Sequence, residues 1–394
     1  MGGGAGTMGH RRSEPAVDRE GSGRTREALE AGGPDLRVLI YRLGSLGDTI
    51  AALPCFHQIA RAFPRAERRV LTNIPRNPKA PALKTILENS GLVHGYIEYP
   101  LKLRDLAQLW QLRRRIRDWN PHWLIYLVEP KDLFSIYRDL LFFKSCGIRD
   151  LVGVPYTRSL RQHQRLGQGE IYEGESHRLA RCLKPLGDIN LDDGRNWDLH
   201  LTPAELASTR EILRPLENRP FIVCGAGTKM PVKDWGVDNW QRLLPQVGAR
   251  CPGYGLVMVG SADEFPRGEV LARAWPGRTL NLCGPLTPRE SAAVIRQASL
   301  FVGHDSGPMH LAASLGIPCV AVFSARNRPG VWFPQGAGHK VLYHQTECFD
   351  CRLELCPPRH RRKCIASISV AEVLEAVEEV ISARIMPAAN VCRK

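Results

Sequence analysis

The segment 42–48 (RLGSLGD) places a carboxylate and two glycines between a short apolar run and a helical pattern. Gly44 and Gly47 allow a tight turn and let another group approach the backbone closely. Asp48 stands where the helix would begin, so one interpretation is a helix cap that accepts backbone N–H groups. The other is a general base that faces a ligand cleft from the carboxyl end of a strand. The spacing fits neither GxGxxG nor a P-loop, which argues against dinucleotide and Walker-type sites.

The segment 304–310 (HDSGPMH) has the features of an anion site at a helix start. An apolar run ends in Asp-Ser-Gly, and Pro308 is favourable in the first turn of a helix. The N–H groups of such a turn bind phosphate or diphosphate, and Ser306 would add a hydroxyl. His304 or His310 would supply a further donor. The alternative is an ordinary connection from a strand to a helix, with a polar side chain as its cap.

Two further loops follow apolar runs. In 224–235 (CGAGTKMPVKDW), Thr228 and Lys233 would hold a diphosphate through charge-assisted hydrogen bonds, and the alternative is a solvent-exposed loop. In 260–264 (GSADE), Glu264 would bind a ribose or sugar hydroxyl, or else cap the next helix. Loops that follow parallel strands meet at one edge of a sheet, so both are expected to face the same cleft.

Four of the 12 cysteines lie within 17 residues, at Cys348, Cys351, Cys356 and Cys364. Four thiolates at this density favour a structural zinc or iron–sulfur site. The spacing differs from the paired CxxC of a zinc ribbon, so a packed Cys-rich loop that oxidises on purification is the alternative. Thiols are kept reduced in the cytoplasm, so a disulfide framework is not expected.

The composition is that of a globular protein with an anionic partner. The chain has 394 residues, of which 43% are hydrophobic, and disorder over its whole length is excluded. No run approaches 18 consecutive apolar residues, and the first 35 residues hold no stretch typical of a secretory signal, so a cytoplasmic protein is expected. The net charge of +14 favours nucleic acid, acidic lipid or a phosphorylated substrate.

Short apolar runs alternate with helical patterns along the chain. Strands are predicted at 37–42, 69–72, 95–99, 122–128, 151–154, 221–224, 255–260, 279–282, 300–303, 319–323 and 341–343. Helices are predicted at 48–63, 103–118, 239–249, 264–274, 288–298, 308–315 and 370–384. This alternation indicates an α/β protein with two doubly wound parallel sheets, and two such domains form a cleft at the carboxyl ends of their strands.

These motifs resemble those of glycosyltransferase family nine, the ADP-heptose:lipopolysaccharide heptosyltransferases. Residues 37–54 (RVLIYRLGSLGDTIAALP) are similar to the amino-terminal signature of that family. Residues 304–323 (HDSGPMHLAASLGIPCVAVF) are similar to its carboxyl-terminal signature, in which Thr is usual at Ser306. Residues 233–235 (KDW) resemble its lysine-aromatic loop, and a Cys-rich stretch before a terminal helix occurs in a branch of the family. The resemblance covers residues from about 36 to 385 and is weak in the middle third.

The resemblance implies a GT-B fold, in which the two domains face each other across the cleft. The expected divisions are a disordered tail at 1–34, an acceptor-side domain at 35–205, a nucleotide-sugar domain at 206–367 with the Cys-rich loop 348–364, and a terminal helix and tail at 368–394. The implied reaction is inverting transfer without a metal cofactor, from a donor such as ADP-heptose to an anionic glycolipid or glycan such as the lipopolysaccharide core. A basic protein acting on such an acceptor would contact the cytoplasmic face of the inner membrane.

The resemblance also implies a role for each matched residue. Asp48 would deprotonate the acceptor hydroxyl, and Lys233 would neutralise the departing diphosphate. The acceptor-side loop would be Gly44, Ser45 and Gly47, and the donor-binding set would be Thr228, Glu264, Asp305, Ser306, Gly307, Pro308, Met309 and His310. Within that set Glu264 would bind the ribose, and the positive end of the helix at 308–310 would favour the phosphates.

Two other classes of protein stay open. One is a nucleic-acid binder built on the four cysteines and the basic cluster 359–363 (RHRRK). No aromatic-interleaved basic motif of the RRM or KH kind accompanies that cluster, so nucleic acid is not the expected partner. The other is a non-catalytic scaffold protein of the same family, against which the presence of Asp48 and Lys233 argues.

Overall fold

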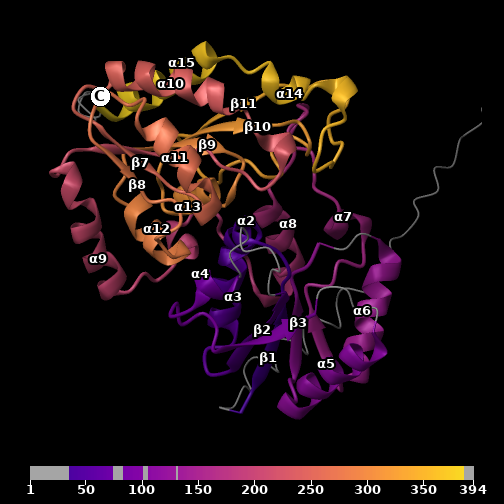
Figure 1. The fold of residues 1–394 in the computed structure, drawn as a ribbon. Coiled ribbons are helices and arrows are strands. Elements are labelled where there is room, and N and C mark those ends of the chain that lie inside the picture. The colour runs from indigo at the N-terminus through magenta and orange to yellow at the C-terminus, as the bar shows by residue number, and fades with distance from the viewer. Residues whose placement is uncertain (1–34, 74–82, 101–104, 130–131, 386–394) are drawn as a thin grey trace, which may run out of the picture.

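A computed structural model describes residues 35–73, 83–100, 105–129 and 132–385. These residues form two α/β domains, each built on one parallel sheet, with the second domain stacked on the first (Figure 1). The tail predicted to be disordered, residues 1–34, lies outside the described residues. Within the described part of the chain, no helix combines the length and the apolar composition needed to cross a bilayer.

The first sheet has five parallel strands in the order β3-β2-β1-β4-β5. They are β1 (Arg37–Tyr41), β2 (Glu67–Asn73), β3 (Gly95–Tyr99), β4 (Trp123–Tyr126) and β5 (Asp150–Val152). The helices that belong to this sheet are α2 (Leu46–Ala51), α3 (Leu53–Ala62), α4 (Lys84–Leu87), α5 (Leu106–Trp119) and α6 (Leu133–Ser145). Alternate residues of β1 point to opposite faces, so Val38 and Ile40 pack with α3 while Leu39 and Tyr41 pack with α5 and α6.

The helix predicted at 48–63 is divided into two in the structure. Helix α2 ends at Ala51, and α3 begins at Leu53. Pro54 has no N–H group to donate to the carbonyl of Ile50, so the hydrogen-bond ladder stops there and restarts from Ala52. The break lets α2 leave the sheet at its own angle, and α2 carries Asp48.

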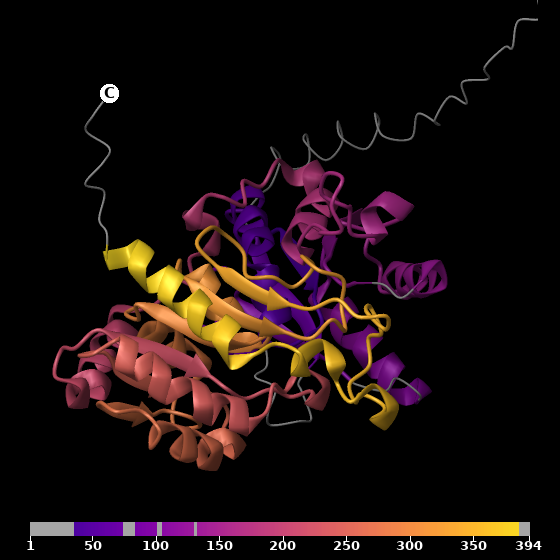
Figure 2. The same cartoon turned by 90° about the horizontal axis from the view of Figure 1, so that it is seen from above.

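The second sheet has six parallel strands in the order β11-β10-β9-β6-β7-β8. They are β6 (Phe221–Gly225), β7 (Gly255–Met258), β8 (Thr279–Asn281), β9 (Leu300–His304), β10 (Cys319–Phe323) and β11 (Lys340–Tyr343). The helices are α10 (Val237–Arg250), α11 (Phe265–Ala272), α12 (Pro288–Ile295), α13 (Gly307–Ser314), α14 (Lys363–Ala366) and α15 (Val370–Ile385). Helix α15 lies beside α10 on one face, where both bury apolar side chains against the sheet (Figures 1 and 2).

Three helices connect the sheets: α7 (Arg158–Arg161), α8 (Glu175–Cys182) and α9 (Pro203–Leu213). Helix α8 packs against α3 of the first domain, and α9 packs against α12 of the second. The predicted limit between residues 205 and 206 therefore falls inside α9, a helix that packs on the second domain.

The two domains touch through the starts of α2 and α13. A Cβ atom added at Gly47 would lie 2.9 Å from Cδ2 of His310, and one added at Gly307 would lie 2.7 Å from Cδ2 of Leu46. The glycines thus allow a backbone approach that any larger residue would block. One hydrophobic cluster also continues from the first sheet, through α3, to α12 and α13 of the second domain. The loops predicted to do chemistry are consequently brought together at one junction.

Candidate active site in the interdomain cleft

A cleft of about 830 Å³ lies between the domains, at the carboxyl ends of both sets of strands. Most of the residues predicted to form the site line it: Ser45, Gly47, Asp48, Thr228, Lys233, Glu264, Asp305, Ser306, Gly307, Pro308 and His310. Met309 is placed elsewhere, because its side chain is fully buried in the hydrophobic core. Gly44 is not among the lining residues and acts on the site through the turn that holds Asp48.

Asp48 lies in the first turn of α2 and is half-buried at the cleft wall. Its Oδ2 atom accepts hydrogen bonds from the backbone N–H of Ser45 at 2.7 Å and from the Ser45 hydroxyl at 3.0 Å. The carboxylate therefore does cap the helix start, as one interpretation expected. It also faces the ligand cleft, as the other expected. The hydrogen bonds to Oδ2 orient the Asp48 carboxylate, so the same residue caps the helix and faces the cleft.

The turn before Asp48 depends on Gly44. This residue has φ of +140°, and a Cβ atom there would lie 2.4 Å from Cβ of Asp48. Its N–H group donates to Oδ1 of Asn73 at 2.8 Å, which ties the turn to the end of β2. A side chain at position 44 would strain the backbone and push Asp48 out of place.

A buried ion-pair network holds the other side of the same turn. The Arg42 guanidinium donates to the carbonyl oxygens of Leu127 and Asp48, both at 2.5 Å. Glu175 of α8 lies 3.7 Å from that guanidinium and forms a 2.6 Å pair with Arg178. Burial would raise the pKa of the Glu175 carboxyl, but Arg178, a hydrogen bond with His163 and Arg42 together outweigh burial and hold this pKa well below its usual range. The charges are therefore fixed, and they position the backbone of Asp48.

Lys233, Asp305 and His310 form a compact group on the opposite wall. The Lys233 ammonium lies 2.7 Å from Oδ2 of Asp305 and donates to the Asp305 carbonyl at 3.2 Å. Nε2 of His310 lies 3.7 Å from Oδ1 of the same carboxylate. Burial would raise the pKa of Asp305, but Lys233 and His310 outweigh it and hold this pKa at about 2. Asp305 is thus an anion that orients two cationic or donor groups toward the cleft.

The start of α13 offers further donors. Ser306 precedes the helix in extended conformation, and its Oγ is buried with no hydrogen-bond partner among the described residues. The first N–H groups of a helix lack intrahelical partners and carry partial positive charge. Ser306 and Gly307 both line the cleft. This corner is suited to an anionic group such as a phosphate.

His304, proposed as a further donor, is not in the cleft. Its ring is completely buried, and Nε2 accepts the backbone N–H of Trp235 at 3.0 Å. The ring also packs edge-on against Trp240. Burial lowers the pKa of His304 to about 4, so the imidazole is neutral near pH 7. Through its hydrogen bond with Trp235 the ring holds the loop that contains Lys233.

Thr228 and Glu264 complete the wall of the second domain. Glu264 accepts the N–H of Ser261 through Oε2 at 2.9 Å and so caps the short helical turn that contains it. A Cβ atom at Gly227 would lie 2.0 Å from the Glu264 carboxyl carbon, so the two loops touch closely. Thr228 Oγ1 accepts the N–H of Met230 at 3.4 Å. Both side chains face the cleft with polar atoms that a ribose or phosphate would use.

Several charged lining residues were not in the predicted set. They are Arg161, His163, Lys229, Arg328 and Arg352. Lys229 lies inside a recognised motif, and partial burial lowers its pKa while the Asp48 carboxylate acts in the opposite direction. Arg328 and Arg352 both pair with Asp350, at 2.9 Å and 3.2 Å. No motif marks these arginines: Arg161 ends α7, Arg328 lies between β10 and β11, and only Arg352 belongs to the Cys-rich loop.

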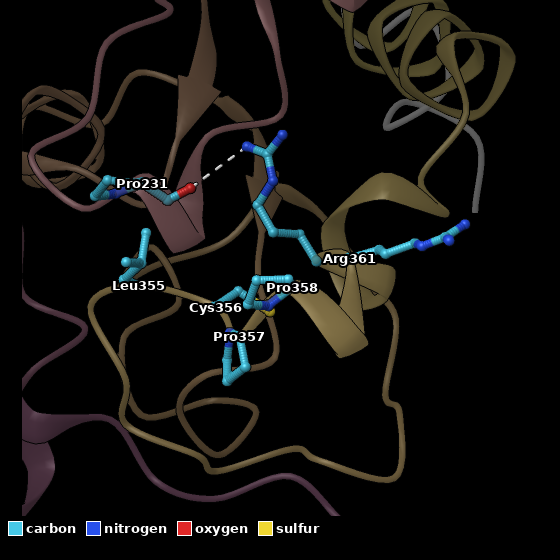
Figure 3. Close-up of a pocket in the computed structure, with 7 residues that line it drawn as sticks. Pro231, Leu355, Cys356, Pro357, Pro358 and Arg361 are labelled. Carbon is cyan, nitrogen blue, oxygen red and sulfur yellow. Dashed lines mark hydrogen bonds between the residues drawn. The ribbon is translucent and has the colours of Figure 1, made fainter.

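The Cys-rich loop 348–364 supports the loop of Lys233. The carbonyl of Glu354 accepts the N–H of Val232 at 3.1 Å, and the Arg362 guanidinium donates to the carbonyls of Pro231 at 3.5 Å and Asp234 at 2.8 Å. Figure 3 shows the hollow between these segments, in which Pro231 and Leu355 face each other and Cys356 lies beside Pro357 and Pro358.

The four cysteines of this loop are free thiols. Burial raises the pKa of Cys364, and the other three cysteines act in the same direction, so all four gather in one region. Among the described residues, however, no group of three or more His, Cys, Asp or Glu side chains is arranged to hold a metal ion. The side chains as placed do not fit a zinc or iron–sulfur site, and that metal stays a prediction.

Comparisons with known proteins agree on one family. Residues 177–360 match the sequence model of Glycosyltransferase family 9 (heptosyltransferase). Lipooligosaccharide heptosyltransferase 2 of Campylobacter jejuni is 29% identical over 103 residues, which are 26% of this chain and 31% of that protein. Lipopolysaccharide heptosyltransferase 1 of Pseudomonas aeruginosa is 25% identical over 345 residues, which are 82% of this chain and 87% of that protein. The match spans only about a third of the C. jejuni relative.

Solved structures show the same architecture. The glycosyl transferase family 9 structure from Veillonella parvula superposes with a TM-score of 0.64 at 17% identity, covering 88% of this chain and 98% of that one. The structure of E. coli ADP-heptose lps heptosyltransferase II gives a TM-score of 0.61 at 20% identity, with 89% and 100% covered. Two facing parallel-sheet domains and a cleft at their carboxyl ends define a GT-B fold. Over residues 177–360 the chain is similar to the heptosyltransferases of glycosyltransferase family 9.

Proposed function

We propose that this protein is an inverting glycosyltransferase that moves a heptose-like sugar from a nucleotide donor, with ADP-heptose the first candidate, to a lipopolysaccharide-core or other cell-envelope glycan. One observation carries the proposal. The carboxylate of Asp48 on the first domain and the Lys233–Asp305–His310 group on the second line the same cleft. The fold and the family support the same reaction class.

In the proposed reaction, Asp48 takes the proton of the acceptor hydroxyl as the new bond forms to the anomeric carbon. The bond from that carbon to the diphosphate oxygen breaks, and the electron pair leaves with the nucleoside diphosphate. Lys233 and the start of α13 stabilise the negative charge that develops there. These protein groups take the part that a divalent ion plays elsewhere, so the proposal includes metal-independent transfer. Thr228 and Ser306 would bind phosphate oxygens, and Glu264 the ribose.

The proposed location is the cytoplasmic side of the inner membrane, with transient contact at its surface. Nucleic acid is not a proposed partner. The net charge of +14 suits an acceptor that bears phosphates or acidic sugars, and the exposed rim arginines of the cleft belong to the same charge surplus.

The test is the change Asp48→Asn, assayed after nucleotide sugars have been screened for binding. Asn keeps an oxygen that accepts the Ser45 hydrogen bonds, so the turn is preserved and only the basicity is lost. Turnover is expected to fall by roughly 10²–10⁴-fold, while donor affinity measured by calorimetry stays within about threefold. Near-normal turnover would reduce Asp48 to a helix cap. Transfer by the wild-type protein should persist in EDTA, and strict dependence on Mg²⁺ or Mn²⁺ would contradict the metal-independent mechanism.

A further inference from the structure

The outer faces of α5 and α6 carry large apolar side chains in contact with solvent. The most exposed are Leu106 at 83%, Phe134 at 76% and Leu141 at 72%, with Trp110, Leu133 and Tyr137 also exposed. The core is already filled by other residues of the same helices, among them Ile116 and Phe143. These two helices are therefore apolar on two faces, and folding of the domain explains only the inner one.

The exposed side chains follow the helical repeat. On α5, Leu106 and Trp110 are four residues apart, and on α6 Phe134, Tyr137 and Leu141 are three and four apart. Each set therefore forms a stripe along one side of its helix. The two helices lie beside each other, and Figure 1 places them on the face of the first sheet opposite α3 and α4. The Arg113 guanidinium joins them by donating to the carbonyl of Ser145 at 3.0 Å. The stripes make one surface, here called the α5–α6 surface.

Basic residues continue both stripes toward the helix ends. Arg114 and Arg117 follow Trp110 by four and seven residues, and Lys144 follows Leu141 by three. The Arg114 guanidinium lies 5.7 Å from the Trp110 ring. Asp118 offsets part of this charge through a 3.7 Å pair with Arg114. The remaining pattern, aromatic and aliphatic tips flanked by arginine and lysine, is complementary to a bilayer with anionic headgroups.

The position of the surface relative to the cleft supports the same partner. Helices α5 and α6 begin after β3 and β4, so their first turns lie at the carboxyl edge of the sheet, from which Asp48 also projects. Leu106, Trp110 and Phe134 are all in the first half of their helices. A bilayer against these turns would bring its headgroups near the first-domain side of the cleft.

We propose that the α5–α6 surface docks this protein on an anionic lipid bilayer, with Phe134, Leu141, Leu106 and Trp110 entering the headgroup region and the arginines binding lipid phosphates. The docking itself is independent of the sugar that is transferred. The idea that docking presents a lipid-linked acceptor to Asp48 rests on the proposed function.

The experiment is co-sedimentation of the full chain with phosphatidylglycerol–phosphatidylcholine vesicles and with phosphatidylcholine vesicles alone. The wild type is expected to bind the anionic vesicles, with binding that weakens as salt rises. The double change Phe134→Ser/Leu141→Ser should lower the partition coefficient by about tenfold or more. The pair Arg114→Gln/Arg117→Gln should lower binding to anionic vesicles by a similar factor and leave binding to neutral vesicles unchanged.

Leu355→Ser is the matched control, because Leu355 is 70% exposed and lies on the Cys-rich loop of the other domain. It should bind vesicles like the wild type. Circular dichroism on each variant shows whether a loss of vesicle binding comes from misfolding. Calorimetry with the donor shows separately whether the proposed function holds. Equal vesicle binding by all variants would overturn the proposal. The proposal would also be overturned if the wild type did not bind vesicles but formed a dimer in light scattering, and if the double change Phe134→Ser/Leu141→Ser dissociated that dimer.

Discussion

Asp48, Lys233 and Ser306 are predicted site residues because each lies in the segment between a strand and the next long helix, and all three line the cleft. Parallel strands end at one edge of a sheet, so such loops meet whatever the rest of the chain does. Glu175 could not be found in this way, and Arg42 opens the segment 42–48 without any sign in the sequence of its buried partner. Each is an ordinary charged residue in its own segment, and only the folded chain shows that they lie 3.7 Å apart and act together on the backbone of Asp48.

His304 gives a prediction about acid stability. Its pKa is lowered by burial from 6.5 to about 4, so between these values the unfolded chain binds a proton that the folded chain does not. The free energy of unfolding should therefore decrease as pH falls from about 6.5 toward about 4. Urea unfolding at several pH values measures this slope.

The variant His304→Gln tests the assignment. A Gln oxygen is able to accept the Trp235 N–H but does not titrate, so the decrease in stability across this pH window should become smaller. Other histidines, such as the buried His57 and the half-buried His339, also have lowered pKa values, so part of the pH dependence of stability should remain in the variant. An identical slope in the wild type and the variant would contradict a neutral, buried His304.

At the scale of elements, most strands were predicted well, since buried parallel strands are continuous apolar runs. The strands predicted at 95–99 and 319–323 are confirmed by β3 and β10. Helix α8 could not be recognised by the same signal. Its buried face contains Glu175, Ser176 and Arg178 beside Leu179 and Cys182, and the Arg178 guanidinium donates to the Glu175 carboxylate. From the pattern of polar residues alone, such a face is expected to be exposed to solvent. It is buried here because Arg178 and Glu175 form an ion pair.

The Cys-rich loop is the element with the sharpest open prediction. If Cys348, Cys351, Cys356 and Cys364 bind zinc or iron, protein purified without oxygen or chelator should contain about one equivalent, because a structural site is normally filled. Elemental analysis measures this. Metal at a tenth of an equivalent or less would contradict the prediction. In either case Cys364→Ala should lower stability more than turnover per folded molecule, since the loop contacts the turn before Lys233 but not the reacting atoms.

At the scale of the whole molecule, the sequence predicts two sheets but not their contact. Counted from β3 in the first sheet and from β8 in the second, the first five strands follow the same order. The contact of α2 with α13 depends on the close approaches at Gly47 and Gly307. Neither glycine differs in sequence from one that merely makes a turn, so the position of one domain on the other had to come from the structure.

Arg289 links the two domains through several hydrogen bonds. It is 4% exposed on α12 and donates to the carbonyls of Ile86 and Leu199, at 2.8 Å and 3.0 Å, and to the Glu205 carboxylate at 2.6 Å. Arg289→Ala should lower the free energy of unfolding by roughly 3 kcal/mol, because it removes the cation paired with Glu205 and leaves buried carbonyls without their donor. Arg296→Ala, at the exposed end of the same helix, should change it by less than about 0.5 kcal/mol. Similar unfolding curves for both variants would contradict this role.

The pairing of Arg42 with Glu175 also has a consequence for how the chain is made. On the ribosome, β1 emerges long before α8, although all five strands of its sheet are complete by Val152. Until α8 has been synthesised, Arg42 lacks the carboxylate of Glu175, and the apolar side chains of α3 that pack against α8 lack their partner. The nascent domain is therefore expected to stay open until translation has passed α8. A fragment of the first domain that stops before α8 would lack Glu175 in the same way. A fragment intended to fold on its own should therefore extend beyond Cys182.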